Sequence, residues 1–420
     1  MAKYQRVTGM RDVLFEDQRY WRFILSKIQE TADLFGYQRL DTPLLEQASL
    51  FVRGVGEGTD IVEKEMYIFQ DRDGDHLALR PEFTAGLMRA YIENGLYTLP
   101  TPLRIWTAGP IFRHERPQAG RYRQHSQFDI EVIGEQDPAV DVEVISVAWH
   151  LFTSLGFYGL RLYLNSTGCP ECKPTYTKAL VDYFTQFATK LPPADKIRLQ
   201  KNPLRILDSK EALTQPLLED APRIIDYLCA DCADHFEQLQ AYLEAMGRSY
   251  SVDHRIVRGL DYYTKTVFEI KADGLGSQDT ICGGGRYDGL IEELGGRPTP
   301  GIGFGSGIER FVIALKYLGV VPPPEPFSKV TVSYLGESAK LVALDLAEKL
   351  RTENIGAILT PGNRSLKAQL KAADRIEAAF AIILGEDEVK AKQVAIRNMR
   401  DGQQTLVDLT DVTVWLTERL

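Results

Sequence analysis

The sequence predicts an α+β body, with an antiparallel sheet flanked by helices, that carries a helical insertion and precedes a smaller α/β domain. β-Branched and aromatic residues dominate from Leu103 to Val132 and from Tyr262 to Ile270, which is typical of long antiparallel strands. Between about residues 165 and 250 the apolar residues take helical spacing. After residue 329 strand and helix patterns alternate, which favours helices packed on a mostly parallel sheet.

The body begins with a predicted helix, which Gly36 ends. Its apolar face consists of residues at helical spacing: Trp21, Ile24, Leu25, Ile28, Ala32 and Phe35. Near residue 80 a second helix is expected, with Thr84 suited to its N-cap and Glu82 free to receive an ammonium group.

Residues 112–134 predict a hairpin, because two strand patterns flank a loop with Pro117 and Gly120 near its tip. Alternation along the returning strand gives it one apolar and one polar face. The polar face carries Gln127, Asp129 and Glu131. Acidic and amide side chains inside an apolar domain need partners, so this face is predicted to line a ligand site.

The run GVVPPPEPF, 319–327, contains four of the 21 prolines and predicts a linker, because proline continues neither a helix nor a central strand. Beyond it, strands are expected at 330–335, 357–360 and 380–385, with helices at 340–350 and 365–375. The predicted organisation is therefore a body at 1–325 with an insertion at about 165–250, a linker at 319–328 and a second domain at 329–420.

Composition excludes several classes of protein. The 420 residues carry a net charge of -9, which argues against nucleic-acid binding by bulk electrostatics but leaves local basic surfaces open. The segment after the linker is neutral and suits an approach to a polyanion, although chance explains this equally well. No apolar run reaches membrane-helix length, and the first residues do not resemble a secretory signal. Five cysteines favour a reducing cytoplasm.

Arginines gather on the hairpin loop, where four lie within one short stretch: Arg113, Arg116, Arg121 and Arg123. A solvated loop explains them about as well as an anion site does. Further on, Arg258 precedes paired tyrosines, Tyr262 and Tyr263, which suit an aromatic or cationic ligand. A structural turn with core tyrosines is the alternative for that segment.

Two glycine-rich stretches follow. CGGGRYDGL, 282–290, permits close backbone approach but matches neither a Walker A loop nor a dinucleotide fingerprint. GIGFGSGIER, 301–310, runs from a strand into a helix whose first turn holds Arg310, a residue that can reach a phosphate or remain an exposed helix charge.

Two Cys-x-x-Cys pairs bracket the helical insertion: Cys169 with Cys172, and Cys229 with Cys232. Four thiolates fit a tetrahedral structural zinc, and His235 could replace one of them. Buried hydrophobic cysteines are the alternative. Cys282 is expected to be a lone buried thiol.

Together these motifs resemble the histidyl-tRNA synthetases, a class II aminoacyl-tRNA synthetase family, over nearly the whole chain. RGLDYYTKTVFE, 258–269, is the most specific piece, because other class II synthetases lack it. The other matching segments are GMRD (9–12), TPLLEQASLF (42–51), LRPEFTAG (79–86), FRHERPQAGRYRQ (112–124), GGRYDGL (284–290), GFGSGIER (303–310), GNRSLKAQLKAAD (362–374) and ILGEDE (383–388).

The resemblance implies roles at matching positions. The residues implied to bind histidine are Glu82, Phe83, Thr84, Gln127, Glu131, Arg258, Tyr262 and Tyr263. Those implied to bind ATP are Arg113, Arg121, His125 and Arg310. Arg113, Arg258 and Arg310 would be catalytic through their fixed positive charge. Arg116 and Gln118 would meet the acceptor end of the tRNA. The resemblance also implies Mg²⁺, a homodimer formed through 42–51 and an anticodon-binding domain at 329–420.

The chain departs from the family in three places. Phe83 stands where a glycine is usual, His125-Ser126 stands where an aromatic-His pair is usual, and Gly305-Ser306 replaces bulkier residues. The aromatic residue stacks on adenine in the family, and His125 would do so less well.

The predicted function is therefore a cytoplasmic histidine–tRNA ligase that uses L-histidine, ATP and tRNA(His). A histidine-binding regulatory subunit of ATP phosphoribosyltransferase is the main alternative, and an RNA-binding module with decayed sites is the third. Histidine-dependent ATP–pyrophosphate exchange distinguishes them.

Overall fold

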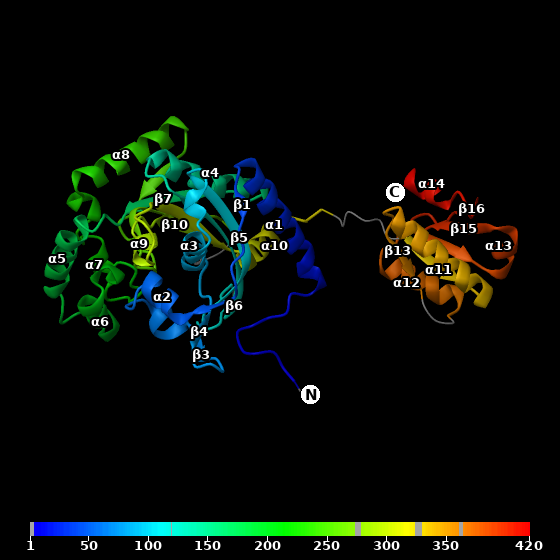
Figure 1. Ribbon diagram of the computed structural model, residues 1–420, viewed down its shortest axis with the longest axis horizontal. Coiled ribbons are helices and arrows are strands. Elements are labelled where there is room, and N and C mark those ends of the chain that lie inside the picture. Colours follow the sequence, from blue (N-terminus) through cyan, green and yellow to red (C-terminus); the bar gives the residue numbers. More distant parts are fainter. Residues whose placement is uncertain (1–3, 119, 274–278, 324–329, 361–363) are drawn as a thin grey trace. The chain divides into compact units, whose positions relative to one another are not determined.

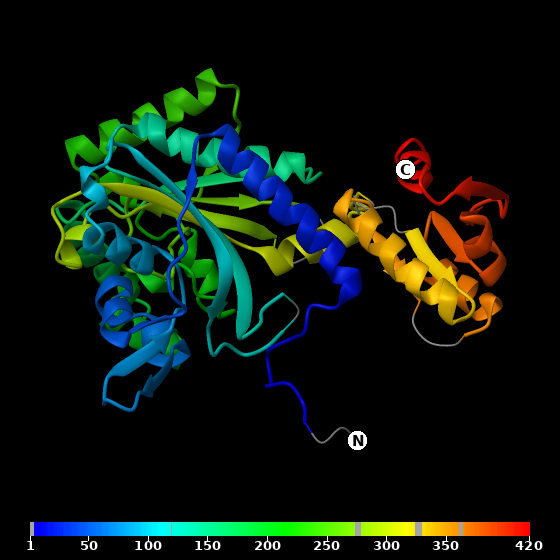
Figure 2. The same ribbon diagram turned by 45° about the vertical axis from the view of Figure 1, so that its right-hand side comes forward.

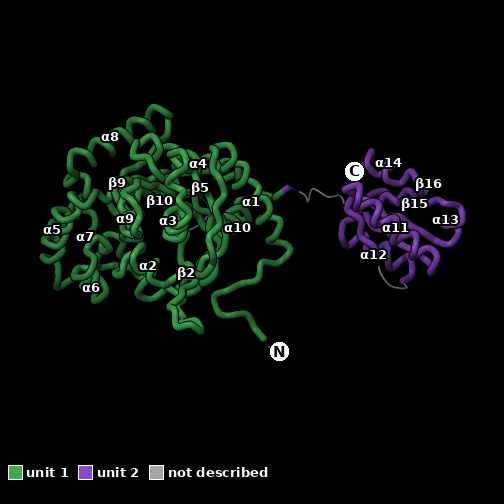
Figure 3. The backbone as a smooth tube through the Cα atoms, viewed as in Figure 1, with its two compact units in different colours: residues 1–322 green, residues 323–420 purple. Residues whose placement is uncertain are grey.

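The structure, a computed structural model (Figure 1), describes residues 4–118, 120–273, 279–323, 330–360 and 364–420. The chain divides into two compact units, Met1–Pro322 and Pro323–Leu420, shown in Figure 3. Part of the predicted proline-rich linker, residues 324–328, lies outside the described residues. None of the described helices is long and apolar enough to cross a lipid bilayer.

The first unit is built on an eight-stranded sheet in the order β1-β5-β6-β11-β10-β9-β7-β8. The outermost pair at each edge, β1 with β5 and β7 with β8, is parallel, and all other pairs are antiparallel. The predicted antiparallel sheet is therefore confirmed for its six central strands. The long hairpin strands β5 and β6 can be followed in Figure 2. The strands are β1 (Gln38–Arg39), β5 (Leu103–Phe112), β6 (Gln124–Ile133), β7 (Arg161–Ser166), β8 (Tyr250–Val252), β9 (Thr264–Lys271), β10 (Thr280–Arg286) and β11 (Gly301–Gly307).

Four helices cover one face of this sheet and bury the largest core with it. They are α1 (Phe15–Leu34), α4 (Pro138–Ser154), α8 (Ala230–Ala245) and α10 (Ile308–Tyr317). In α1, Ile24, Ile28 and Ala32 are buried as predicted, and Gly36 follows the helix with a φ of +75°. The prediction that Leu25 lies on the buried face is wrong, because the residue is 41% exposed. Successive residues of a helix are rotated by about 100°, which turns Leu25 away from the face that buries Ile24.

The opposite face of the sheet packs against α3 (Thr84–Glu93) and α9 (Leu290–Glu293) through a second apolar cluster. This cluster surrounds the polar middle of the sheet. A small three-stranded sheet in the order β2-β4-β3 lies in the same unit. The remaining elements of this region are β2 (Leu45–Gln47), α2 (Ala48–Val55), η1 (Ile61–Glu65), β3 (Tyr67–Gln70), β4 (His76–Leu79) and η2 (Leu96–Thr98).

The predicted helical insertion has its own apolar core, formed by residues between Tyr176 and Ile224. Its elements are α5 (Cys172–Thr185), α6 (Pro193–Lys201), η3 (Pro203–Ile206), α7 (Gln215–Leu218) and η4 (Ile224–Tyr227). Helix α8, which the sequence assigned to the insertion, instead buries Phe236, Leu239 and Leu243 in the core of the main sheet. The separately packed insertion is therefore shorter than residues 165–250.

The second unit has a five-stranded sheet in the order β13-β12-β14-β15-β16. The first three strands are parallel, whereas β15 and β16 form an antiparallel continuation that the sequence pattern did not reveal. Its elements are β12 (Val330–Tyr334), α11 (Glu337–Thr352), β13 (Ala357–Leu359), α12 (Leu366–Arg375), β14 (Phe380–Leu384), α13 (Glu386–Ala391), β15 (Gln393–Asn398), β16 (Gln404–Asp408) and α14 (Val412–Thr417).

Candidate active site

Strand β6 gives the candidate site its polar floor. The predicted alternation is present: Phe128, Ile130 and Val132 enter the main core, while the side chains of Gln127, Asp129 and Glu131 line a cavity on the other face. Asp129 and Glu131 are buried. Buried carboxylates require partners or protonation, so this cavity is suited to a polar ligand.

Glycines in β10 and β11 provide the space for these side chains. Gly303 pairs with Glu131 across the strands, and a Cβ atom on Gly303 would lie 1.8 Å from Glu131 Oε2. A Cβ on Gly305 would lie 1.9 Å from Gln127 Nε2, and one on Gly283 would lie 2.3 Å from Arg258 Nη2. The glycine-rich motifs therefore leave room for functional side chains of neighbouring segments.

Glu131 is held by two hydroxyl groups. Thr84 Oγ1 donates to Glu131 Oε1 at 2.7 Å, and Tyr287 Oη donates to Glu131 Oε2 at 2.6 Å. The prediction of Thr84 as N-cap is wrong, because it is the first residue of α3 and its hydroxyl reaches the sheet. Glu82 instead satisfies a free backbone N–H at the start of the helix, because its Oε1 accepts a hydrogen bond from Ala85 N at 3.0 Å.

Three buried acceptor atoms on residues that line the cavity have no hydrogen-bond partner among the described residues: Glu82 Oε2, Gln127 Oε1 and Asp129 Oδ1. Leaving a buried acceptor unpaired costs about 1–3 kcal/mol. A protonated primary amine offers three N–H donors, the same number as these acceptors. The cavity therefore suits an ammonium group.

Burial also sets the protonation of this site. It raises the pKa of Glu131 to about 8, although the hydrogen bonds from Tyr287 and Thr84 oppose the shift. Burial and the nearby Glu131 and Glu82 carboxylates raise the pKa of Asp129 well above its usual range. Burial raises the pKa of Glu82 as well. A cationic ligand would favour the ionised forms of these groups.

The paired tyrosines add aromatic surface to the same cavity. Tyr262 and Tyr263 are both buried and both line it, with ring centroids 4.8 Å apart. The ring of Tyr287 lies 5.9 Å from that of Tyr262 at an angle of 74°. A flat ligand with polar edges fits among these rings and the Glu131 carboxylate.

A larger and more open cavity of about 560 Å³ adjoins the first. Five residues line both cavities: Arg113, Gln127, Arg258, Gly283 and Gly305. Arg121, His125 and Arg310 line the larger cavity. Seven of the eight residues predicted to bind histidine line the smaller one: Glu82, Thr84, Gln127, Glu131, Arg258, Tyr262 and Tyr263.

Two arginines lie at the junction. Arg258 Nη1 donates to Glu269 Oε1 at 2.5 Å, and Arg258 Nε has no partner among the described residues. Burial opposes the charge of Arg258, but the Glu269 carboxylate together with the Tyr263 and Cys282 side chains more than offsets it and raises the pKa of the guanidinium. Arg113 Nε donates to the carbonyl of Pro81 at 2.7 Å. Both guanidinium groups border a space where an anion can bind, and arginine suits bidentate contact with phosphate and carboxylate.

The outer cavity has its own fixed groups. Arg310 Nη1 donates to the carbonyl of Thr280 at 2.7 Å. Burial, followed by the charges of Arg113 and Arg310, lowers the pKa of His125 to about 3, so its ring is neutral. Glu309 accepts from Ser126 N with both carboxylate oxygens at 2.9 Å, which ties the start of α10 to β6.

Arg116 and Gln118 do not line these two cavities. They are exposed on the loop between β5 and β6, where Gln118 N donates to the carbonyl of Arg121 at 3.2 Å. Gln118 lines a separate open groove of about 660 Å³ together with the segment Gln5–Arg11. This groove contains Arg6 and Arg11, so it is basic.

Phe83 also lies outside the described lining. Its ring is 1% exposed in the apolar cluster beneath α3, and the guanidinium carbon of Arg80 lies 4.2 Å from its centroid. Sequence reasoning missed Tyr287 as the partner of Glu131 and Glu269 as the partner of Arg258. Tyr287 stands in the GGRYDGL motif, which could have marked it as a site residue. Alternation along β9 places Glu269 on the face opposite to the buried Phe268, which could have indicated that Glu269 faces the site.

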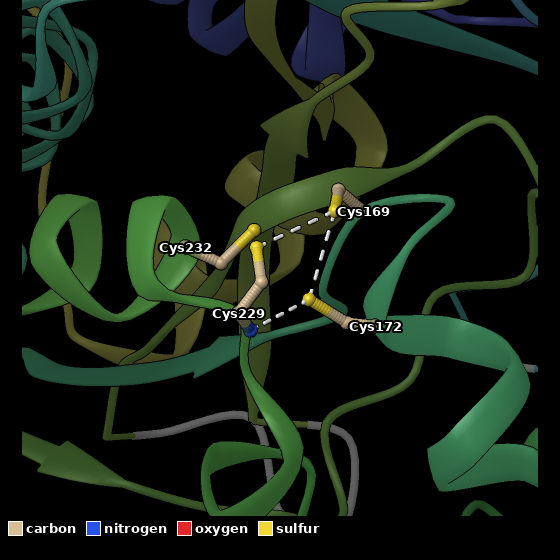
Figure 4. A group of neighbouring side chains, drawn as sticks. All are labelled: Cys169, Cys172, Cys229 and Cys232. Atoms are coloured by element: carbon tan, nitrogen blue, oxygen red, sulfur yellow. Dashed lines mark hydrogen bonds between the residues drawn. The ribbon is translucent and has the colours of Figure 1, made fainter.

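The four predicted cysteines meet at one point (Figure 4). Their Sγ atoms all lie within 4.8 Å of one another, with Cys169 Sγ 3.6 Å from Cys172 Sγ and 3.8 Å from Cys229 Sγ. A tetrahedral zinc with Zn–S bonds of about 2.3 Å separates its sulfurs by about 3.8 Å. A disulfide requires about 2 Å, so the spacing fits a metal.

The chemistry of the donor set agrees with this spacing. Cys172 Sγ accepts a hydrogen bond from Cys229 N at 3.1 Å. Burial opposes ionisation of Cys169, but hydrogen bonds from the backbone of Cys172 and Glu171 and from neighbouring thiols together outweigh it and lower the pKa to about 7. Burial and the neighbouring thiols raise the pKa of Cys232, so a bound cation would be needed to ionise all four thiols. The alternative ligand His235 is excluded, because its Nε2 lies 2.9 Å from Asp141 Oδ2 in the main core. Cys282 is a buried free thiol, as predicted.

Comparison with known proteins agrees with the motifs. The family model for histidyl-tRNA synthetase matches residues 9–170 and 199–311, and that for the anticodon binding domain matches 329–419. A histidine–tRNA ligase of Dehalococcoides mccartyi is 50% identical over 406 residues, which are 97% of each chain. One of Caldanaerobacter subterraneus subsp. tengcongensis is 45% identical over 96% of this chain and 97% of that protein.

The crystal structure of apo S. aureus histidyl-tRNA synthetase superimposes with a TM-score of 0.83 at 33% identity. The match covers 98% of this chain and 99% of that one. Fold, motifs and sequence therefore agree over nearly the full length, and the chain belongs to the histidyl-tRNA synthetase family.

Proposed function

We propose that this protein is a histidine–tRNA ligase. It activates L-histidine with ATP to histidyl-adenylate and pyrophosphate, and then transfers the histidyl group to the 3′ end of tRNA(His). The observation that carries the proposal is the junction of the two cavities, where Arg113 and Arg258 border both. An acid-lined, aromatic cavity on one side suits histidine, and a cavity with further arginines on the other suits ATP.

The smaller cavity supports a specific orientation of histidine. Glu82, Thr84 and Gln127 receive the α-ammonium group, and the unpartnered acceptors Glu82 Oε2, Gln127 Oε1 and Asp129 Oδ1 support this assignment. Glu131 accepts a hydrogen bond from the imidazole, which lies against Tyr263 and Tyr262. An amino acid without this ring would leave the buried Glu131 under-satisfied, at a cost of about 1–3 kcal/mol.

Adenylate formation takes place at the junction. An oxygen of the histidine carboxylate attacks the α-phosphorus, the bond from that phosphorus to the bridging β-oxygen breaks, and pyrophosphate leaves. Arg113 brings carboxylate and α-phosphate together, and Arg258 stabilises the charge that builds on the phosphoryl oxygens. Such catalysis is mostly positioning and fixed positive charge.

The rest of ATP occupies the larger cavity. Arg310 and Arg121 hold the outer phosphates, and the neutral ring of His125 lies against adenine. Mg²⁺ prefers oxygen ligands and uses one or two carboxylates with substrate phosphates. Glu115 and Glu269 line this cavity and fit that requirement. The ion would neutralise phosphate charge there.

We assign tRNA binding to two surfaces. Arg116 and Gln118 contact the acceptor end, and the basic groove between their loop and Gln5–Arg11 supports this role. The second unit, 329–420, binds the anticodon, in keeping with its family match. Helix α12 presents a charged, largely exposed surface that includes Lys367 and Lys371.

We also propose that the enzyme is a homodimer. The segment 42–51 and the adjoining small sheet expose apolar side chains that a second copy would cover: Leu44, Leu45, Ile68 and Phe69 are each 42–48% exposed. Light scattering after size exclusion tests this proposal. The five free thiols support a reducing compartment, the cytoplasm.

We further propose that the four cysteines hold a structural zinc. The sulfur spacing and the backbone N–H donated to Cys172 Sγ support this assignment. The ion would join the two ends of the insertion, since one pair lies at the start of its first helix, α5, and the other follows its last element, η4.

Histidine-dependent ATP–pyrophosphate exchange and charging of tRNA(His) test the function. Both activities are expected for the wild-type protein, and other amino acids should not support exchange. Histidine binding without exchange would instead indicate the regulatory-subunit alternative, which the full-length ligase relatives do not favour. RNA binding without either activity would indicate a decayed site.

A further inference from the structure

The cysteine cluster is connected to the segment that forms one wall of the histidine cavity. We infer that a zinc ion at the cluster, together with Lys173, positions residues 258–265 for histidine binding. The inference rests on the proposed function and adds to it a link between metal content and substrate affinity. Arg258, Tyr262 and Tyr263 of this segment line the cavity, so a shift of its backbone would move three contacts at once.

The first connection is made by the backbone. Thr167 N donates to the carbonyl of Lys265 at 2.7 Å, and Lys265 N donates to the carbonyl of Gly168 at 2.9 Å. Lys265 has a φ of 48°, which a non-glycine residue adopts only when its surroundings hold it. The residue after Gly168 is Cys169, so this reciprocal pair joins the 258–265 segment to the cluster.

The second connection is made by Lys173, which follows Cys172 in the first turn of α5. Its Nζ donates to the carbonyl of Tyr263 at 2.8 Å. The half-buried ammonium group of Lys173 therefore holds the peptide of Tyr263 in place through its carbonyl oxygen. The side chain of the same residue, Tyr263, lines the cavity.

The turn that precedes the cluster packs closely against Cys172. Gly168 has a φ of +65°, and a Cβ atom on it would lie 2.7 Å from Cys172 Cβ. The turn is therefore closely packed against the sulfur ligands. The insertion that follows has its own core, so the cluster is one of the points at which α5 is tied to β7 and α8.

Other contacts also hold the segment, and they limit the expected effect. Asn202 Nδ2 donates to Asp261 Oδ1 at 3.1 Å, and Asp261 N donates to the carbonyl of Val55 at 3.1 Å. Loss of the cluster should thus weaken histidine binding without abolishing it. ATP contacts made by Arg113 and Arg310 do not pass through this connection. Arg258 of the segment also borders the ATP cavity, but its proposed role is in the transition state and not in ground-state ATP binding.

The test uses the full-length protein. Zinc is measured by mass spectrometry of the purified protein before and after dialysis against a chelator, and again after each titration, because free histidine also binds zinc. Calorimetry then gives the dissociation constants for L-histidine and, separately, for ATP. The variants are Lys173→Met, Lys173→Arg and the control Lys178→Met, a change on the exposed face of the same helix. Circular dichroism confirms that each remains folded.

We expect one zinc per chain. Zinc removal or Lys173→Met should weaken histidine binding about tenfold, the effect of one lost hydrogen bond to a charged group. ATP affinity should change less than about twofold, Lys173→Arg should restore most of the histidine affinity, and Lys178→Met should have no effect. When zinc is removed from the Lys173→Met variant, the dissociation constant for histidine should rise by less than the product of the two separate fold-changes. The two effects are not independent because both act on the same segment.

Equal histidine affinity in the zinc-loaded and zinc-free proteins would overturn the inference. So would a protein that carries no zinc and does not take it up, or one in which the cysteines form disulfides. A parallel loss of ATP affinity would indicate general destabilisation and would also count against it. Failure of the zinc-loaded wild type to bind histidine would instead overturn the proposed function itself.

Discussion

Replacing Arg258 with alanine tests the central chemical claim. The side chain lies where the two cavities meet, its Nη1 bonds to Glu269 and its Nε remains available to a ligand. Its charge should matter most when negative charge builds on the α-phosphoryl group. The substitution should therefore lower kcat for adenylate formation more than it raises KM for either substrate.

The magnitude follows from the geometry. Two unit charges about 4 Å apart, at an effective dielectric constant of about 20, interact by about 4 kcal/mol. Removal of one preorganised hydrogen-bond donor to a transition-state charge elsewhere costs about 3–4 kcal/mol. Both values predict a fall in rate of about 10²- to 10³-fold. Glu269 keeps a hydrogen bond from Thr280 Oγ1 at 3.1 Å, which limits the effect on folding.

ATP–pyrophosphate exchange at saturating histidine and ATP measures the effect, with urea unfolding to verify stability. Arg255→Ala is the matched control, because this neighbouring arginine pairs with Asp253 and lines neither cavity. It should retain nearly full exchange. If Arg258→Ala kept more than about a tenth of the wild-type rate while folded, the assignment of Arg258 to the α-phosphate would be wrong.

Three further predictions concern the cavity, its protonation and the tRNA. Gly303→Ala should destabilise the protein by about 1–3 kcal/mol in urea unfolding and abolish measurable histidine binding, because the new Cβ atom would collide with Glu131 and a backbone carbonyl. The control Gly58→Ala, whose Cβ atom would lie in open space, should change neither stability nor binding. Burial raises the pKa of Glu131 to about 8, and the ionised carboxylate is a stronger acceptor for the imidazole N–H than the protonated acid. Histidine affinity should therefore rise by up to about tenfold per pH unit between about pH 6.5 and pH 8. A flat calorimetric profile, or the same slope in Glu131→Gln, would contradict this role. Arg116→Ala should leave exchange unchanged and slow the charging of tRNA(His), and charging by the variant should depend less on salt concentration than charging by the wild type. Equal loss of both activities would show that the role of Arg116 lies elsewhere.

The raised pKa of Glu131 also has a consequence for folding. The carboxyl ionises at a lower pH in the unfolded chain, near its ordinary value of 4.5, than in the folded one. The unfolded state therefore binds fewer protons between these values, and the contribution of Glu131 to stability falls as pH rises from about 4.5 to about 8.

The sequence by itself determined the features that depend on local periodicity. The period of two along 124–133 assigned Gln127, Asp129 and Glu131 to one face because successive side chains of a strand must point to opposite sides. Helical spacing located α1, and strand–helix alternation located the first three strands of the second unit. The cysteine pairs indicated a common metal site because four thiolates suit one tetrahedral ion, but sequence alone left buried hydrophobic cysteines as the alternative. Only the structure brought the four sulfurs together.

Only the tertiary structure decided which distant segments meet. Thr84 was a plausible cap, but its hydroxyl is used by Glu131 across 47 positions of sequence. Helix α8 has an amphipathic pattern that fits either the insertion or the main sheet, and only packing chose the sheet. His235 stands close to two cysteines in sequence and still turns to Asp141. Periodicity fixes the face on which a side chain lies, whereas its partner depends on long-range packing, which one-dimensional spacing does not encode.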